Sequence, residues 1–187
     1  MTLILTALAL WFTTGVLCLA FARRPRLVQT IGPVGAVLGS LPALFDASRA
    51  LLSGSVTSLH LPWSLPSANF AIGMDALSAF FTLPIVLICA LAAIYGREYL
   101  RPYEGRKALG LSWCMFNVLA ASMLLVVLAR NAVLFLFAWE AMSLSSFFLV
   151  LFESENASVR RAGWTYLVAT HIGTAFLLVL FVLLGQQ

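Results

Sequence analysis

One acidic residue, Glu140, lies near the middle of a long apolar segment. The segment runs from Arg130 to Phe152 and reads RNAVLFLFAWEAMSLSSFFLVLF. At about 1.5 Å of rise per residue, a helix of this length crosses a hydrocarbon layer of about 30 Å. A charged side chain at its midpoint costs on the order of 2.5–3.5 kcal/mol to insert. We therefore expect Glu140 to face other helices or internal water and to have a functional role.

A carboxyl group in this position can bind and release a proton. Apolar surroundings favour its neutral form and a nearby cation favours its ionised form, so its proton affinity follows its environment, as a proton relay requires. Ser143 follows one helical turn later on the same face, and its hydroxyl could hydrogen-bond the carboxyl or hold a water. The alternative is that Glu140 stays neutral and only joins two helices by a hydrogen bond.

His171 is the second candidate for proton chemistry. It lies near the middle of another apolar segment, within YLVATHIGT from Tyr166 to Thr174. Imidazole can accept a proton on one nitrogen and release one from the other near neutral pH. We predict that His171 neighbours Glu140 in a proton relay. The alternative is a neutral imidazole that hydrogen-bonds a carbonyl or a threonine.

The composition indicates a polytopic membrane protein. Of 187 residues, 62% are hydrophobic and 10% are charged, whereas soluble domains have about 25% charged residues. The net charge of +4 comes from basic residues at helix ends, so we expect no nucleic-acid partner. The three cysteines stand apart from one another, and no glycine-rich phosphate loop is present. We therefore expect no catalytic residues, no metal and no cofactor on this chain.

The apolar runs predict an all-α transmembrane bundle with six spans. These cover roughly residues 3–21, 28–52, 74–95, 109–128, 132–152 and 162–184. We divide the chain into residues 1–73, with two helices and a loop, and residues 74–187, with four helices. The first span has no basic residues before it, so we expect a membrane helix and not a cleaved signal. In the second span, the spacing of Gly35 and Gly39 predicts close approach of another helix.

The basic residues predict the orientation. Nine of the eleven fall on one side of a six-span arrangement: Arg23, Arg24, Arg26, Arg97, Arg101, Arg106, Lys107, Arg160 and Arg161. By the positive-inside rule this side is cytoplasmic, so both termini are expected on the outer side of a bacterial inner membrane. Arg130 falls on the outer side, where we expect it to reach toward the lipid headgroups.

The segment from Ser53 to Phe70 is the longest stretch outside the predicted spans. Alternating apolar residues, among them Val56, Leu59, Leu61 and Trp63, predict a short hairpin or an extended cover over the helix ends. We expect His60 to be a solvated loop residue. Asp75, which follows this segment, suits the first turn of the third helix because an acid there complements the helix dipole.

Three segments resemble a known family of membrane subunits. The run ARNAVLFLFAWEAMSLSSFFLVLFE, residues 129–153, resembles the fifth helix of the antiporter-like proton-translocating subunits of respiratory complex I, Mrp-type antiporters and membrane-bound hydrogenases. GMDALSAFFTLP, residues 73–84, and YLVATHIGTAFLL, residues 166–178, are most similar to the antiporter-like subunits of hydrogenase-4 and of formate hydrogenlyase. The resemblance implies that Glu140 is the acid of a glutamate–lysine pair in a proton half-channel. It places His171 in a helix where members carry varied polar or basic residues.

The resemblance also implies parts that the six spans do not contain. In the family the partner lysine lies in the seventh helix, and the channel-forming repeat runs from the fourth helix to the eighth. The only lysine here, Lys107, falls in a predicted loop. We therefore expect either a separate chain that supplies further helices or a truncated product.

Three functions remain open on this basis. The first is a non-catalytic membrane subunit of a redox-driven proton-translocating complex of hydrogenase or NADH dehydrogenase type, with Glu140 as a buried protonation site. The second is a split or truncated sodium/proton antiporter subunit. The third is a non-conducting membrane scaffold of a hydrogenase-like complex. In each case the expected partners are the lipid bilayer and other membrane subunits.

Overall fold

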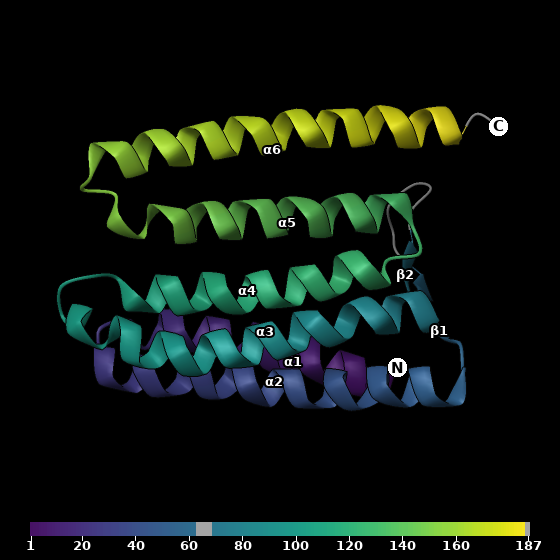
Figure 1. Ribbon diagram of the computed structural model, residues 1–187, viewed down its shortest axis with the longest axis horizontal. Helices are drawn as coiled ribbons and strands as arrows, with labels where there is room; N and C mark the ends of the chain where they lie inside the picture. The colour runs from purple at the N-terminus through teal and green to yellow at the C-terminus, as the bar shows by residue number, and fades with distance from the viewer. Residues whose placement is uncertain (63–68, 186–187) are drawn as a thin grey trace.

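The structure, a computed structural model, describes residues 1–62 and 69–185. This part of the chain contains six helices that are long and apolar enough to cross a membrane. They are α1 (Thr2–Ala20), α2 (Pro25–Ser53), α3 (Ala76–Leu100), α4 (Leu109–Leu128), α5 (Ala132–Val150) and α6 (Ala157–Leu184). All six run along the long axis of the molecule (Figure 1). The predicted all-α bundle of six spans is confirmed.

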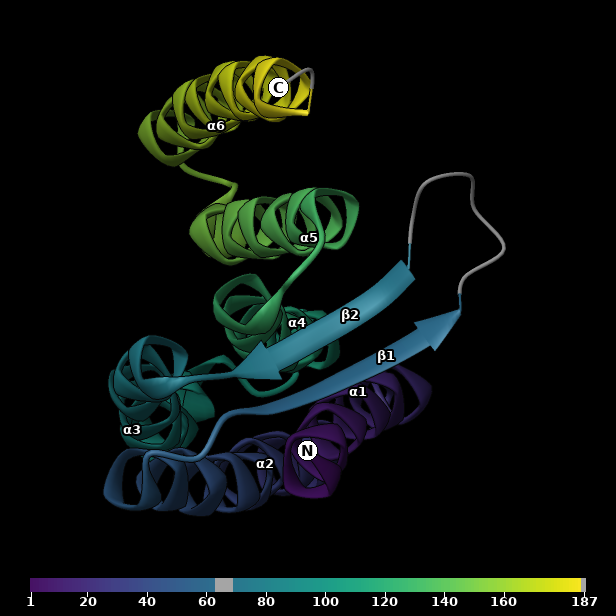
Figure 2. The same ribbon diagram turned by 90° about the vertical axis from the view of Figure 1, so that its right-hand side faces the viewer.

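The first four helices form a packed group, and the last two stack outward from it. Helix α2 packs against α1, α3 and α4, whereas α5 packs on α4 and α6 packs on α5. Figure 2 shows α4, α5 and α6 as successive layers on one side of the molecule. Among the described residues of α6 only Gly163 is buried. The two helices that carry Glu140 and His171 are therefore the last two layers on this side of the structure, with α6 outermost.

A β-hairpin covers one end of the bundle, which we call the hairpin end. Strand β1 (Thr57–Pro62) pairs antiparallel with β2 (Asn69–Met74), in the register Thr57↔Met74 to Pro62↔Asn69. Of the two arrangements expected for this segment, the structure has the hairpin (Figure 2). His60 is exposed, as expected, but lies on β1 and not in a loop. Trp63 falls outside the described residues.

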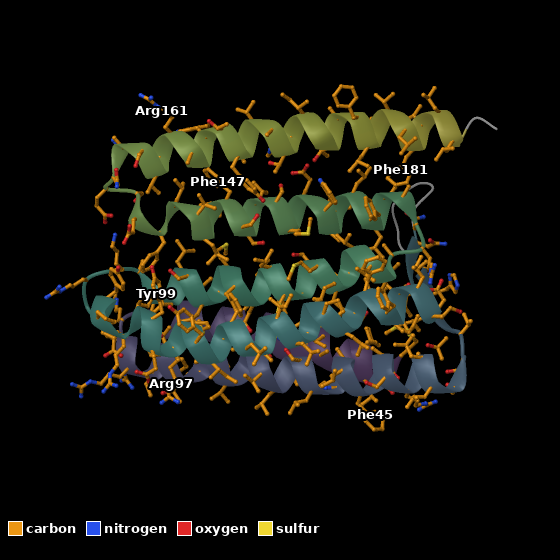
Figure 3. The ribbon with its side chains drawn as sticks, in the orientation of Figure 1. Phe45, Arg97, Tyr99, Phe147, Arg161 and Phe181 are labelled. Atoms are coloured by element: carbon orange, nitrogen blue, oxygen red, sulfur yellow. The ribbon has the colours of Figure 1, made fainter. Side chains whose placement is uncertain are left out.

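The opposite end carries the connections α1–α2, α3–α4 and α5–α6, and we call it the basic end. Nine arginine and lysine residues lie on these connections and the adjoining helix turns. In Figure 3 the labelled Arg97 and Arg161 both lie there. Both chain termini lie toward the hairpin end (Figure 1).

Short polar side chains cap the N-termini of three helices. The Asp75 carboxylate accepts the Ser78 backbone N–H at 2.8 Å and caps α3. Asn131 and Asn156 cap α5 and α6 in the same way. Such caps satisfy backbone N–H groups that have no partner within the helix. Each polar cap therefore sets the residue at which an apolar span begins.

Glycines of α2 let this helix lie close to α1. A Cβ atom on Gly35 would come within 2.2 Å of the Thr14 side chain, and one on Gly39 within 2.4 Å of Trp11. The indole Nε1 of Trp11 donates to the Ala36 carbonyl at 2.9 Å, so the contact is also hydrogen-bonded. The close helix approach predicted from the Gly35–Gly39 spacing is confirmed.

Candidate functional site

Glu140 on α5 and His171 on α6 face each other between the two helices. The distance from His171 Nε2 to Glu140 Oε2 is 3.6 Å. Helices α5 and α6 are antiparallel neighbours joined by a short connection, so the middle of one lies beside the middle of the other (Figure 1). The Glu140 side chain is 30% exposed and that of His171 is 50% exposed. The two residues that the sequence singled out therefore lie side by side, and both side chains are partly exposed.

The second nitrogen of His171 is held by its own helix. Nδ1 lies 2.9 Å from the carbonyl oxygen of Leu167, one turn earlier in α6. The sequence left open whether the imidazole contacts Glu140 or a carbonyl, and in the structure it does both. This second contact fixes the ring orientation and leaves Nε2 directed at the carboxyl.

Ser143 does not contact the Glu140 carboxyl. Its side chain is buried, and its hydroxyl donates to the main-chain carbonyl of Glu140 at 3.4 Å. A helical serine readily reaches back to a carbonyl of the preceding turn, and this local bond competes with longer ones. Of the two roles considered for Ser143, the hydrogen bond to the Glu140 carboxyl is therefore not the one that its hydroxyl makes here. The suggestion that Ser143 holds a water stays a prediction.

A second polar contact joins the same two helices two turns away. The Tyr166 hydroxyl of α6 hydrogen-bonds the Ser146 hydroxyl of α5. Ser146 itself donates to the Met142 carbonyl at 2.9 Å, so Tyr166 is the donor to Ser146. This pair was not predicted from the sequence. Ser146 lies six residues after Glu140 and Tyr166 five before His171, and near-equal spacings on antiparallel helices bring such residues together.

Apolar contacts flank the polar ones along the α5–α6 interface. The Phe135 and Phe181 rings lie 5.5 Å apart, edge to face, on the side toward the hairpin end. Toward the basic end, Phe147 lies beside Trp164, with ring centroids 6.5 Å apart. Figure 3 shows Phe147 and Phe181 in the space between α5 and α6, toward opposite ends. The Glu140–His171 pair is thus bracketed by aromatic contacts along the helix axes.

Arg130 fixes the hairpin end of α5. Its guanidinium lies 2.7 Å from the Asp75 carboxylate and also donates to the Ser78 hydroxyl and the Gly73 carbonyl. Its backbone N–H donates to the Ala71 carbonyl at 2.8 Å, which ties the α4–α5 connection to β2. The expectation that Arg130 reaches toward the headgroups is therefore wrong, because acceptors from β2 and the start of α3 surround it.

Hydrogen bonds shift the protonation of Asp75 in this cluster. The Ser78 backbone N–H, and then the Arg130 guanidinium, lower the pKa of Asp75 from 3.8 to about 2. Both partners bind the ionised carboxylate, which explains the direction of the change. The Asp75 carboxylate therefore stays ionised beside Arg130 near neutral pH.

Lys107 holds the α5–α6 connection at the basic end. Its ammonium group donates to the Phe152 carbonyl at 3.1 Å and is paired with Glu155, and it lowers the pKa of that carboxyl. It also lies 5.4 Å from the centre of the Phe152 ring. The one lysine of the chain is therefore used at a helix connection and does not partner Glu140.

The fold and the site define a class of protein. The chain is a multi-pass helical membrane protein with a titratable pair between two of its spans.

Comparison with known proteins finds similarity to one group of membrane proteins. Residues 129–187 match the family described as NADH:quinone oxidoreductase/Mrp antiporter, TM. Hydrogenase-4 component B of Escherichia coli (strain K12) is 30% identical over 87% of this chain. Na(+)/H(+) antiporter subunit A1 of Staphylococcus haemolyticus is 33% identical over 71% of it. The resemblance predicted from the sequence is confirmed: the chain is similar to antiporter-like membrane subunits of this kind.

A solved structure shows the same fold. A chain in the structure of the Mrp complex from Dietzia sp. DQ12-45-1b superimposes with a TM-score of 0.73 and 26% identity, over 96% of this chain. The chain spans 24% of the length of the Escherichia coli relative, 16% of the staphylococcal one and 19% of the solved chain. The similarity therefore concerns a part of each of these larger proteins.

Proposed function

We propose that this chain is a membrane part of a redox-driven proton-translocating complex of the hydrogenase or NADH dehydrogenase type, with Glu140 as its protonation site. The observation that carries the proposal is the 3.6 Å contact between Glu140 and His171 in the middle of two membrane spans. Two titratable groups at this depth are costly to insert, and such groups mark ion pathways in membrane proteins. The hydrogenase-4 relative supports this type of complex.

The surroundings explain how protonation would respond to other subunits. Helix α6 has one buried residue, Gly163, among those described, so most of its surface is open to lipid or to further helices. A charge brought near Glu140 by a neighbouring subunit changes the proton affinity of the carboxyl. Other membrane subunits, including a chain that supplies further helices, are therefore proposed partners, and they would drive uptake and release at this site.

The test is a charge-removing substitution in the assembled complex. Glu140→Gln keeps the size and the hydrogen-bonding capacity of the side chain but cannot titrate. We expect proton translocation in membrane vesicles to fall at least tenfold while electron transfer continues. Glu98→Gln is the matched control, because the exposed Glu98–Arg101 pair lies at the basic end, away from the site. Full translocation in Glu140→Gln vesicles would show that Glu140 is not the protonation site.

A cation/proton antiporter is the second candidate. It is favoured by the sodium/proton antiporter relative and by the superposition on a chain of an Mrp complex. The same carboxyl could serve either process, since both need a site that exchanges protons. Dependence of proton flux on sodium, measured in vesicles without a redox substrate, would support the antiporter, and flux that needs the redox substrate would support the first proposal.

The proposed location is a bacterial inner membrane with the basic end in the cytoplasm. The nine basic residues at that end support this orientation through the positive-inside rule. Single cysteines on the hairpin and on the α3–α4 connection, in a background without Cys18, Cys89 and Cys114, provide a test. Only the hairpin cysteine should react with an impermeant thiol reagent added to intact spheroplasts. The reverse pattern would invert the proposed orientation.

A further inference from the structure

The contact between His171 and Leu167 determines which imidazole nitrogen carries a hydrogen. A carbonyl oxygen only accepts hydrogen bonds, so Nδ1, at 2.9 Å from the Leu167 carbonyl, must be protonated to bond it. In a neutral imidazole the lone pair then lies on Nε2. Nε2 is the nitrogen that faces Glu140.

This arrangement restricts the protonation states that hold the two side chains together. An ionised Glu140 opposite a bare Nε2 would place two acceptors face to face. Attraction needs one proton between them, either as a carboxylic acid beside a neutral imidazole or as a carboxylate beside an imidazolium. In the interior of a membrane both forms have no net charge, which avoids the cost of an unpaired ion.

We propose that the Leu167 carbonyl orients His171 so that Glu140 and His171 hold a single transferable proton between them. This inference rests on the proposed function and extends it from one carboxyl to a donor–acceptor pair. Transfer breaks the O–H bond of Glu140 and forms the Nε2–H bond of His171, and the net charge of the pair does not change. The 3.6 Å gap exceeds hydrogen-bond length, so a rotation of the Glu140 side chain toward Nε2 accompanies transfer.

Other charges of the described chain lie away from the pair. Helix α4 carries no charged residue, and neither does β2. Helix α6 has Arg160 and Arg161 in its first turns, at the basic end, where Arg160 bonds the Ser154 and Glu155 carbonyls. The short helix η2 (Leu151–Glu153) contributes Glu153, which bonds Tyr103. The remaining titratable side chains on the elements that pack against α5 are Cys114 on α4 and Tyr166 on α6.

The position of the imidazole hydrogens can be measured directly. The chain has two histidines, so His60→Gln leaves His171 as the single imidazole, and His60 is exposed on the hairpin. In the ¹⁵N-labelled full chain in lipid nanodiscs, NMR should show neutral His171 with its hydrogen on Nδ1. Free imidazole side chains prefer the hydrogen on Nε2, so a dominant Nε2–H neutral form in His60→Gln would overturn the proposal.

The shared proton gives a second, independent test. Infrared difference spectra between His60→Gln and His60→Gln/Glu140→Gln report the protonated fraction of Glu140, and NMR reports the imidazolium fraction of His171. Near neutral pH the two fractions should add up to about one. A sum near zero or near two would refute the shared proton. These spectra do not depend on translocation, so a failed flux experiment would remove the proposed function and leave the pair standing.

Discussion

The ion pair between Asp75 and Arg130 offers a quantitative test of how the hairpin end is held together. Asp75→Asn keeps an oxygen that can accept the Ser78 backbone N–H, because asparagine caps helices about as well as aspartate. The substitution removes the negative charge that lies 2.7 Å from the Arg130 guanidinium. It therefore isolates the ion pair from the helix cap.

The expected loss of stability in Asp75→Asn follows from the pKa of Asp75. A pKa lowered from 3.8 to about 2 corresponds to about 2 kcal/mol before any correction for solvent exposure. The Arg130 and Asp75 side chains are 38% and 35% exposed, and part of the shift belongs to the Ser78 cap that asparagine retains. Solvent screening and the retained cap reduce the expected loss to about 1 kcal/mol.

The pH dependence has a definite sign. The folded state lowers the pKa of Asp75, so its stabilisation is complete above the ordinary value of 3.8 and is lost as the pH falls toward about 2. The free energy of unfolding in detergent micelles should differ by about 1 kcal/mol between wild type and Asp75→Asn at pH 7. The difference should shrink below pH 3.8. Equal stability at pH 7, or a difference that persists on acidification, would refute this account. Glu98→Gln, at an ion pair whose side chains are 73% and 68% exposed, is the control and should change little.

Two further substitutions test the packing of the helices. Gly163→Val should weaken the packing of α6 against η2 by about 1–3 kcal/mol, because a Cβ at Gly163 would already lie 2.7 Å from Leu151. Unfolding in micelles measures this loss. Gly173→Ala is the control and should not destabilise the protein, because nothing lies within 4 Å of a Cβ there and alanine favours a helix more than glycine does. In the wild type the Trp113 indole N–H donates to the buried Gln29 side-chain oxygen at 2.6 Å. Trp113→Phe removes this donor and should lower the free energy of unfolding by about 1–3 kcal/mol, because the oxygen stays buried. A stability equal to that of the wild type would show that the bond is dispensable.

The sequence predicted the spans well because apolar length is a local property. The expected limits of the fourth span, 109–128, are those of α4, whereas the sixth helix begins at Ala157, before the expected residue 162. The residues that follow the Asn156 cap are polar, so hydropathy alone does not count them as part of the membrane span. The cap nevertheless starts α6 there. Boundaries set by a cap are therefore harder to predict than those set by apolar length.

The candidate site was predicted in part. Glu140 and His171 lie on consecutive antiparallel helices, so their equal depth follows from the sequence once the spans are placed. The partner of Arg130 could not be found in this way, because Asp75 lies 55 residues earlier and meets it through the hairpin. The direction of the Ser143 hydrogen bond depends on a side-chain rotation that the sequence does not encode.

The two ends of α5 are fixed independently of its middle. Arg130 ties the hairpin end to β2 and α3, and Lys107 ties the basic end through Phe152 and Glu155. Between them, His171 is the one basic side chain within 4.0 Å of the Glu140 carboxyl among the described residues. The structure thus fixes both ends of α5 and leaves the Glu140 side chain 30% exposed between them.

Infrared difference spectroscopy of the assembled complex during turnover tests the central claim most directly. If Glu140 takes up and releases a proton, a carboxylic acid C=O band should appear or disappear when electron transfer starts, and it should be absent from the Glu140→Gln complex. A spectrum that is the same in wild type and Glu140→Gln, with electron transfer running in both, would contradict the claim that Glu140 exchanges its proton.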